Sequence, residues 1–140
     1  MAYWICVVST ENWTIVKSRR IWGVSECWRN VISHVRVGDI LVFYVVPKSL
    51  GGIFEVVSNP YYDNSGIFYS FKSKDEKYPY RVKLRPILVF KEPIDFTPLI
   101  PKLSFTKDMQ RWSTPFRRTM FKISKKDFNI IKNYLEKVTR

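Results

Sequence analysis

The sequence predicts an α+β protein, and three stretches carry the prediction. Residues 40–46 are an unbroken apolar run, which is typical of a strand buried on both faces. Residues 80–90 alternate cations with aliphatic side chains, and a period of two indicates a strand with one solvated face. From Phe128 to Val138, apolar residues recur at spacings of three and four, which predicts a C-terminal helix with one apolar side.

The other elements are shorter. Ser124 to Asp127 resembles a capping box, so we expect Ser124 to cap the C-terminal helix and Asp127 to bond back to it. Runs of Val, Ile and aromatic residues bounded by turn residues indicate strands. The sequence places these further strands at residues 3–9, 53–57, 67–71 and 120–123.

The candidate ligand site lies just before the central apolar run. Residues 21–24 are too short for an element of their own, and they present Trp22 beside a glycine. Residues 25–35 predict a short helix, with Ser25 as its N-cap and Trp28 near its start. A loop with flat side chains that leads into a rigid strand is typical of a pocket for a flat ligand. The alternative is that both tryptophans are core residues, which the apolar stripe on the helix favours for Trp28.

Length and composition predict a single domain over residues 1–140. Hydrophobic residues make up 46% of the chain, which is enough for a core. The apolar runs are too short to span a bilayer, and the first residues lack the basic start and the cleavage site of a signal peptide. We therefore expect a soluble, cytoplasmic protein that is a monomer.

The charge of the chain is asymmetric. The net charge is +12. Residues 1–70 carry six basic and five acidic residues, whereas residues 71–140 carry 18 basic and seven acidic residues. This asymmetry favours a surface that binds the phosphates of DNA or RNA. The alternatives are solubility and a lysine-rich proteome from a hot habitat, and the scarcity of Glu speaks against the second.

Two groups of cations are candidates for binding phosphate. The strand at residues 80–90 puts Arg81, Lys83 and Arg85 on one face. Around Trp112, cations are interleaved with aromatic side chains, which single-stranded nucleic-acid surfaces need for stacking. The alternative is a lid whose aromatic residues pack on the core while its cations stay in water. The cations of this second group are Arg111, Arg117 and Arg118, and Trp112 is the stacking candidate.

No catalytic or metal site is predicted. His34 is the only histidine and has no acidic residue at a helical neighbour spacing. Cys6 and Cys27 stand at no ligand spacing, and we expect both to be free thiols, with a disulfide between them as the alternative. No Gly-rich phosphate loop occurs, and no pair of carboxylates stands out. We therefore expect neither an enzyme nor a cofactor.

With these residues in view, the chain resembles the EVE domain family, a branch of the PUA-like superfamily related to YTH domains. The likeness runs nearly end to end, and it depends on the order and spacing of short motifs. These motifs are Tyr3-Trp4-Ile5, Trp22-Gly23-Val24, Gly38-Asp39, Phe43-Tyr44, Tyr80-Arg81-Val82, Arg117-Arg118, Ile123-Ser124 and Asp127-Phe128.

The resemblance implies a PUA-like mixed β-barrel of about six strands, flanked by short helices and the C-terminal helix. It also implies a non-enzymatic reader that holds an extruded, chemically modified base in an aromatic-lined pocket. Carried over by position, the base pocket would consist of Trp22, Gly23, Val24, Ser25 and Tyr44, with Trp28 and Asn30 near its wall.

The sequence therefore favours a small nucleic-acid-binding module that reads one modified nucleobase in DNA or RNA. Trp22 would stack on the base, and the cations would contact phosphates. The alternative is a small-ligand or protein-interaction module whose basic face meets an acidic partner. A third hypothesis is an enzyme that acts on a nucleotide.

Overall fold

The computed structural model describes residues 1–71 and 73–139. The strands are β1 (Tyr3–Val8), β2 (Ile21–Val24), β3 (Ile40–Val45), β4 (Ser49–Val56), β5 (Tyr61–Tyr62), β6 (Tyr80–Asp95) and β7 (Met120–Ile123). The helices are α1 (Thr10–Arg19), α2 (Arg29–Ile32) and α3 (Lys125–Val138), and short 3-10 turns form η1 (Glu26–Trp28), η2 (Thr97–Leu99) and η3 (Thr114–Arg117). None of the described helices is both long and apolar enough to cross a membrane.

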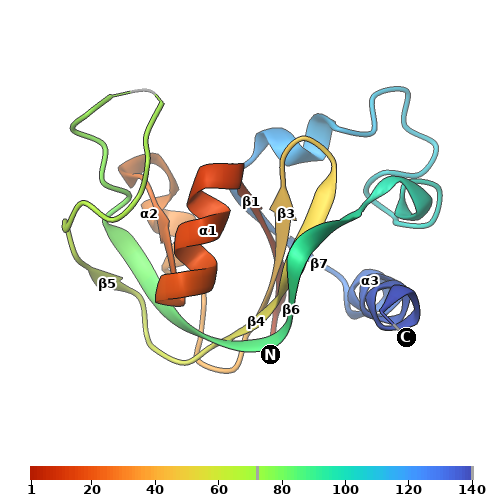
Figure 1. Ribbon diagram of the computed structural model, residues 1–140, viewed down its shortest axis with the longest axis horizontal. Coiled ribbons are helices and arrows are strands. Elements are labelled where there is room, and N and C mark those ends of the chain that lie inside the picture. Colours follow the sequence, from red (N-terminus) through yellow and green to blue (C-terminus); the bar gives the residue numbers. More distant parts are fainter. Residues whose placement is uncertain (72, 140) are drawn as a thin grey trace.

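The strands form a curled mixed sheet in the order β2-β6-β4-β3-β1-β7, and β5 pairs with β6. β1 and β3 run parallel, whereas the other neighbours run antiparallel. β6 is 16 residues long and pairs with β2 and β5 near its start and with β4 beyond them. This long strand sweeps from the side of α1 to the side of α3 (Figure 1). The predicted α+β class and the mixed, barrel-like sheet flanked by helices are confirmed.

The central strand β3 is buried on both faces, as its apolar run predicted. Leu41 and Phe43 pack in one core together with Trp13 of α1, while Val42 and Tyr44 pack in a second core together with α3. Each large apolar side chain buried here stabilises the fold by about 1.5–3 kcal/mol. In Figure 1, α1 and α2 lie on one side of β3 and α3 lies on the other.

At the start of α3, one of the two hydrogen bonds of the predicted capping box is present. Ser124 accepts a hydrogen bond from Asp127 N at 3.0 Å, so its role as N-cap is confirmed. The carboxylate of Asp127 accepts from the N–H of Ser104 at 3.0 Å and from the Ser104 hydroxyl. The predicted hydrogen bond from Ser124 to the Asp127 carboxylate was wrong. That carboxylate instead binds Ser104 and so attaches the chain between η2 and η3 to the start of α3.

Residues 21–24 form a strand, so the prediction that they form no element of their own was wrong. β2 runs antiparallel to β6, with Trp22 opposite Val82 and Gly23 opposite Arg81. The backbone of so short a strand finds its hydrogen-bond partners far along the chain. A local pattern cannot show that pairing.

Two further elements differ from the prediction, while the strands expected at 3–9, 53–57 and 120–123 are present as β1, β4 and β7. Residues 25–35 form η1 and α2 rather than one helix. Ser25 stands at the N-cap position of η1, as predicted, but its side chain makes no cap hydrogen bond.

Residues 67–71 form no strand. The N–H of Tyr69 donates to Asn12 Oδ1 at 2.7 Å, and the Tyr69 carbonyl accepts from Asn12 Nδ2 at 2.8 Å. The side chain of Asn12 on α1 therefore takes the place of a neighbouring strand.

A buried carboxylate ties the N-terminal strand to the turn that enters β3. Asp39 is 3% exposed. Its oxygens accept from the N–H of Ala2 at 2.9 Å, the indole Nε1 of Trp4 at 3.1 Å and the N–H of Arg36 at 3.0 Å. The preceding Gly38 has a φ of 94°, a conformation that favours glycine, so the predicted Gly38-Asp39 turn is confirmed.

We expect Asp39→Ala to lower the free energy of unfolding by about 3 kcal/mol, because it leaves buried donors without an acceptor. Urea denaturation measures the change. The matched control is Asp75→Ala, an exposed aspartate that should change stability by no more than about 0.5 kcal/mol. Equal effects from the two variants would contradict this role of Asp39.

Candidate functional site

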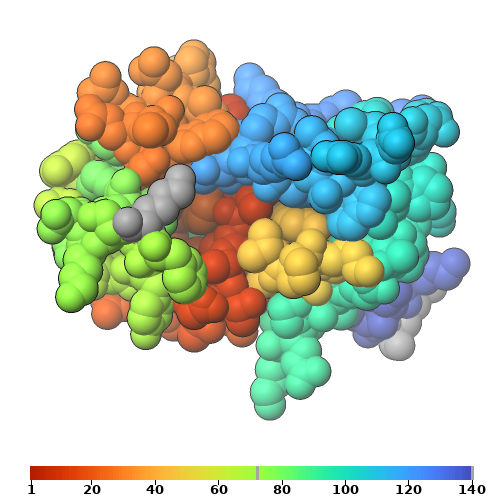
Figure 2. Space-filling model, turned by 90° about the horizontal axis from the view of Figure 1, so that it is seen from above, coloured from red at the N-terminus to blue at the C-terminus, as the bar shows by residue number. Residues whose placement is uncertain are grey.

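A cavity of about 450 Å³ lies between the start of α1, the β2–η1 segment and the chain that precedes β6. Its volume falls within the range of roughly 300–1,000 Å³ that is usual for ligand sites. In Figure 2, the orange segment with η1 and α2, the green segment before β6 and the blue segment before β7 surround red residues of the N-terminal elements. The cavity is lined by Val7, Val8, Ser9, Asn12, Trp22, Gly23, Ser25, Cys27, Trp28, Phe68, Phe71, Glu76, Tyr78 and Thr119.

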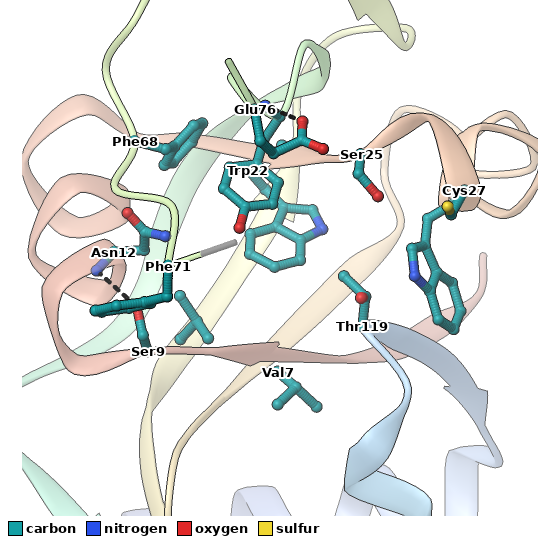
Figure 3. Close-up of a pocket in the computed structure, with 14 residues that line it drawn as sticks. Val7, Ser9, Asn12, Trp22, Ser25, Cys27, Phe68, Phe71, Glu76 and Thr119 are labelled. Carbon is teal, nitrogen blue, oxygen red and sulfur yellow. Dashed lines mark hydrogen bonds between the residues drawn. The ribbon is translucent and has the colours of Figure 1, made fainter. Parts of the chain in front are cut away.

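Trp22 lies at the centre of this site. In Figure 3, Ser25 and Cys27 lie on one side of its ring and Phe68 and Asn12 on the other. The Trp22 ring packs against Phe43 of β3 in an edge-to-face contact, with the ring centroids 5.4 Å apart.

The indole nitrogen of Trp22 has an unmet hydrogen-bonding requirement. Trp22 is 4% exposed, and within the described residues its Nε1 has no hydrogen-bond partner. A buried donor without an acceptor costs about 1–3 kcal/mol and is uncommon in folded proteins. Trp22, which lines the cavity, therefore carries a buried N–H donor that is unsatisfied among the described residues.

Gly23 lets the far wall of the cavity approach β2. A Cβ at this position would lie 2.5 Å from the carbonyl oxygen of Tyr78 and 2.9 Å from the ring of Phe68. We call residues 63–78 the wall segment, because they supply Phe68, Phe71, Glu76 and Tyr78 to the cavity. No helix or strand occurs among the described residues of this segment. One backbone hydrogen bond, from Asp63 N–H to the carbonyl of Pro79 at 2.9 Å, closes the segment, and side-chain contacts hold it against the fold.

Arg81 supplies most of those contacts. Its side chain is fully buried. The guanidinium donates to the carbonyl of Tyr78 at 3.0 Å, the carbonyl of Lys77 at 2.9 Å, and both the hydroxyl (2.8 Å) and the carbonyl of Ser65. An ion pair with Asp63, at 3.5 Å, completes the set. One side chain of β6 thus joins both ends of the wall segment.

The pair remains charged at neutral pH. Burial lowers the pKa of the Arg81 guanidinium, and the charges of Asp63 and Tyr61 oppose that shift. The hydrogen bond from the N–H of Ser65 lowers the pKa of the Asp63 carboxyl below its ordinary value. The wall segment therefore keeps this attachment throughout the physiological range.

Some polar groups of the cavity have hydrogen-bond partners in the protein, whereas the Trp22 Nε1 has none among the described residues. One carboxylate oxygen of Glu76 accepts from the N–H of Tyr78 at 2.9 Å. The amide of Asn12 is engaged by Tyr69. Glu76 is the one charged residue among the described residues that line the cavity. The site therefore combines aromatic rings, a buried indole donor and a carboxylate acceptor, and no cation occurs among the lining residues that the structure describes.

Comparison with known proteins identifies the family. The family model described as the EVE domain matches residues 2–134. The chain belongs to the EVE domain family. A UPF0310 protein of Pyrococcus abyssi is 41% identical over 145 residues, which cover 96% of this chain and 100% of the relative.

Solved structures share the fold at low identity. The Pho92 YTH domain, solved in complex with m6A, has a TM-score of 0.71 and 17% identity, and the match covers 96% of this chain and 82% of that one. Human THYN1, solved in complex with DNA containing 5-methylcytosine, has a TM-score of 0.65 and 15% identity, and the match covers 97% and 98% of the two chains.

Four of the residues predicted for the base pocket line the cavity of this EVE domain. They are Trp22, Gly23, Ser25 and Trp28. The wall segment was not predicted, because its aromatic residues follow neither a period of two nor a helical period. The number of aromatic residues in a stretch with no regular period was the one sign in the sequence that this segment covers a site.

Three other residues predicted for the base pocket do not line this cavity. Val24 is fully buried in the core. Asn30 lines a neighbouring cavity. Tyr44 lies in the second core, stacked on Phe116 at 3.9 Å, where burial raises its pKa to about 12. Alternation along β3 explains the last case, because Phe43 faces the Trp22 side of the strand and Tyr44 must face the opposite side.

The predicted phosphate-binding cations have different environments. The alternation in β6 is confirmed, but the exposure predicted for Arg81 was wrong, because the wall segment covers that position. Lys83 is exposed above the ring of Tyr61, and Arg85 pairs with Glu55. The remaining predicted cations, Arg111, Arg117 and Arg118, are exposed.

Trp112 and the cysteines complete the predicted set. Trp112 packs on Phe96 and Phe116, with ring centroids 5.9 and 6.1 Å away. This favours the alternative of a packed aromatic segment over a stacking surface. Cys6 is buried and Cys27 is exposed, and both are free thiols as expected. In residues 1–71 and 73–139, no group of three or more His, Cys, Asp or Glu side chains is placed to hold a metal ion.

We expect Arg81→Met to lower the free energy of unfolding by about 3 kcal/mol, because it leaves buried carbonyl groups without a donor. Hydrogen exchange should also become faster in the wall segment. The matched control is Arg85→Met on the same strand, whose side chain is 62% exposed and pairs only with Glu55. That variant should change stability by less than about 1 kcal/mol. Similar destabilisation in both variants, without faster exchange in the wall segment, would refute the bracing role of Arg81.

Proposed function

We propose that this EVE domain is a non-enzymatic nucleic-acid-binding module that receives a modified nucleobase, extruded from its strand, in the cavity lined by Trp22. The observation that carries the proposal concerns Trp22, which lines an aromatic-rich cavity and whose buried Nε1–H has no partner among the described residues. An extruded base is flat, and it carries both ring faces and polar edge atoms into such a site.

The chemistry of the lining matches a base. Rings of Trp22, Trp28 and Phe68 offer aromatic surface, and the Trp22 N–H can donate to a ring nitrogen or carbonyl of the base. Glu76 can accept from an amino group, as acidic side chains do from the N4 amino group of cytosine. A carbonyl-rich ligand without an N–H would offer no donor to the second carboxylate oxygen of Glu76.

Two further observations support the proposal. The Pho92 YTH domain and human THYN1, which share this fold, were solved with m6A and with DNA containing 5-methylcytosine. The net charge of +12 suits a polyanion, and exposed cations such as Lys83, Arg111 and Arg117 are available outside the cavity.

We expect Trp22→Phe to lower affinity for the recognised modified oligonucleotide about tenfold, because it keeps a ring but removes the N–H donor, whose hydrogen bond is worth about 1.4 kcal/mol. Affinity for the plain oligonucleotide should change little. Titration calorimetry with plain, 5-methylcytosine and N6-methyladenine oligonucleotides, single- and double-stranded, measures both effects.

The matched control is Trp13→Phe. The Nε1 of Trp13 is also buried without a partner among the described residues, and its ring also packs on Phe43, but Trp13 does not line the cavity. It should leave discrimination between modified and plain strands unchanged. The reader proposal fails if the wild type binds all strands equally. Absence of all oligonucleotide binding would favour a small-ligand or protein-interaction module.

A further inference from the structure

A second cavity of about 450 Å³ adjoins the cavity lined by Trp22, which we call the base cavity. Two features of the chain link them. Trp28 lines both cavities. Thr119 lines the base cavity, and the residues on either side of it, Arg118 and Met120, line the second cavity. The two spaces are therefore separated by little more than one indole side chain and one residue of backbone.

The second cavity carries cations held in place by aromatic rings. The guanidinium carbon of Arg118 lies 4.1 Å from the ring centroid of Phe121. The ammonium of Lys122 lies 5.3 Å from the ring centroid of Trp4. Interactions of this kind stabilise a cation while leaving N–H groups free to donate. Arg118 Nε also donates to the carbonyl of Pro115 at 3.3 Å, and contacts of this kind favour one placement of a side chain, which reduces the entropic cost of binding.

These cations lack acidic partners. In the described part of the chain, neither Arg118 nor Lys122 forms a salt bridge, and no carboxylate lines the second cavity. The base cavity has the opposite character, because Glu76 is its one charged group in the same described residues. The charges of the described lining residues therefore favour an anion in the second cavity over the base cavity.

We propose that the second cavity is a phosphate subsite, in which Arg118 and Lys122 bind the phosphodiester group beside the extruded base while Trp28 separates that group from the base. The subsite rests on the proposed function, since it assigns the position of the backbone relative to the base. A nucleotide would then place its neutral base against Trp22 and its charge against the two cations.

The test compares ligands that differ by a phosphate. The probes are 5-methyl-2′-deoxycytidine and N6-methyladenosine, their monophosphates, and trinucleotides with the same central base. For the wild type, we expect the trinucleotide to bind more tightly than the nucleoside. The double variant Arg118→Gln/Lys122→Gln should bind the nucleoside as the wild type does and lose the phosphate-dependent increase in affinity. Its slope of log K against log salt should fall by about 0.7 for each phosphate of a single strand that the variant no longer neutralises.

Two matched variants keep the interpretation specific. Arg118→Lys/Lys122→Arg preserves both charges and should retain the phosphate-dependent increase in affinity. Arg19→Gln/Lys126→Gln removes the same charge from exposed positions on α1 and α3 and should also retain it. Thermal melting checks that every variant is folded.

The outcomes separate this subsite from the function on which it rests. If the double variant keeps the full phosphate-dependent increase, or if the distant control is weakened as much, the subsite is wrong while the base reader stands. If neither the nucleosides nor the trinucleotides bind to the wild type, the proposed function and the subsite fail together.

Discussion

The site depends on the hydrogen bonds that the buried guanidinium of Arg81 donates to the wall segment. A fully buried cation is expensive unless its hydrogen bonds are satisfied, so the chain around it must present acceptors. The wall segment can do so because its described residues belong to no strand or helix, which leaves the carbonyls of Ser65, Lys77 and Tyr78 available. The same bonds that satisfy Arg81 therefore position an irregular segment over β2.

The two buried faces of β3 divide the molecule. One face supports α1, β2 and the cavity, and the other supports α3 and the aromatic cluster around Phe116. Two indole donors, of Trp13 and Trp22, are buried on the first face without an acceptor among the described residues. Both reduce stability in the free protein. Only the cost at Trp22 can be recovered on binding, because only that ring reaches the cavity.

Sequence reasoning succeeded where one element determines its own pattern. The apolar run of β3, the alternation of β6 and the stripe of α3 each reflect burial on a known face. It failed where the answer depended on a distant segment. β2 needed β6 as a partner, and Arg81 looked solvated until the wall segment covered it. Tyr44 lies outside the cavity for a different reason. Side chains alternate along β3, so Phe43 and Tyr44 face opposite sides of the sheet.

If the two proposed sites are right, the charges of their described lining residues constrain how a nucleotide would bind. Glu76 makes the base cavity unfavourable for phosphate, and the ring-bound Arg118 and Lys122 make the adjoining cavity favourable. In the proposed complex, attraction and repulsion would act in the same direction, so a nucleotide would be oriented as well as attracted. Because Trp28 forms part of both spaces, its indole limits how far base and phosphate can exchange places. A surface with the same net charge but no such division would bind the backbone without directing the base toward Trp22.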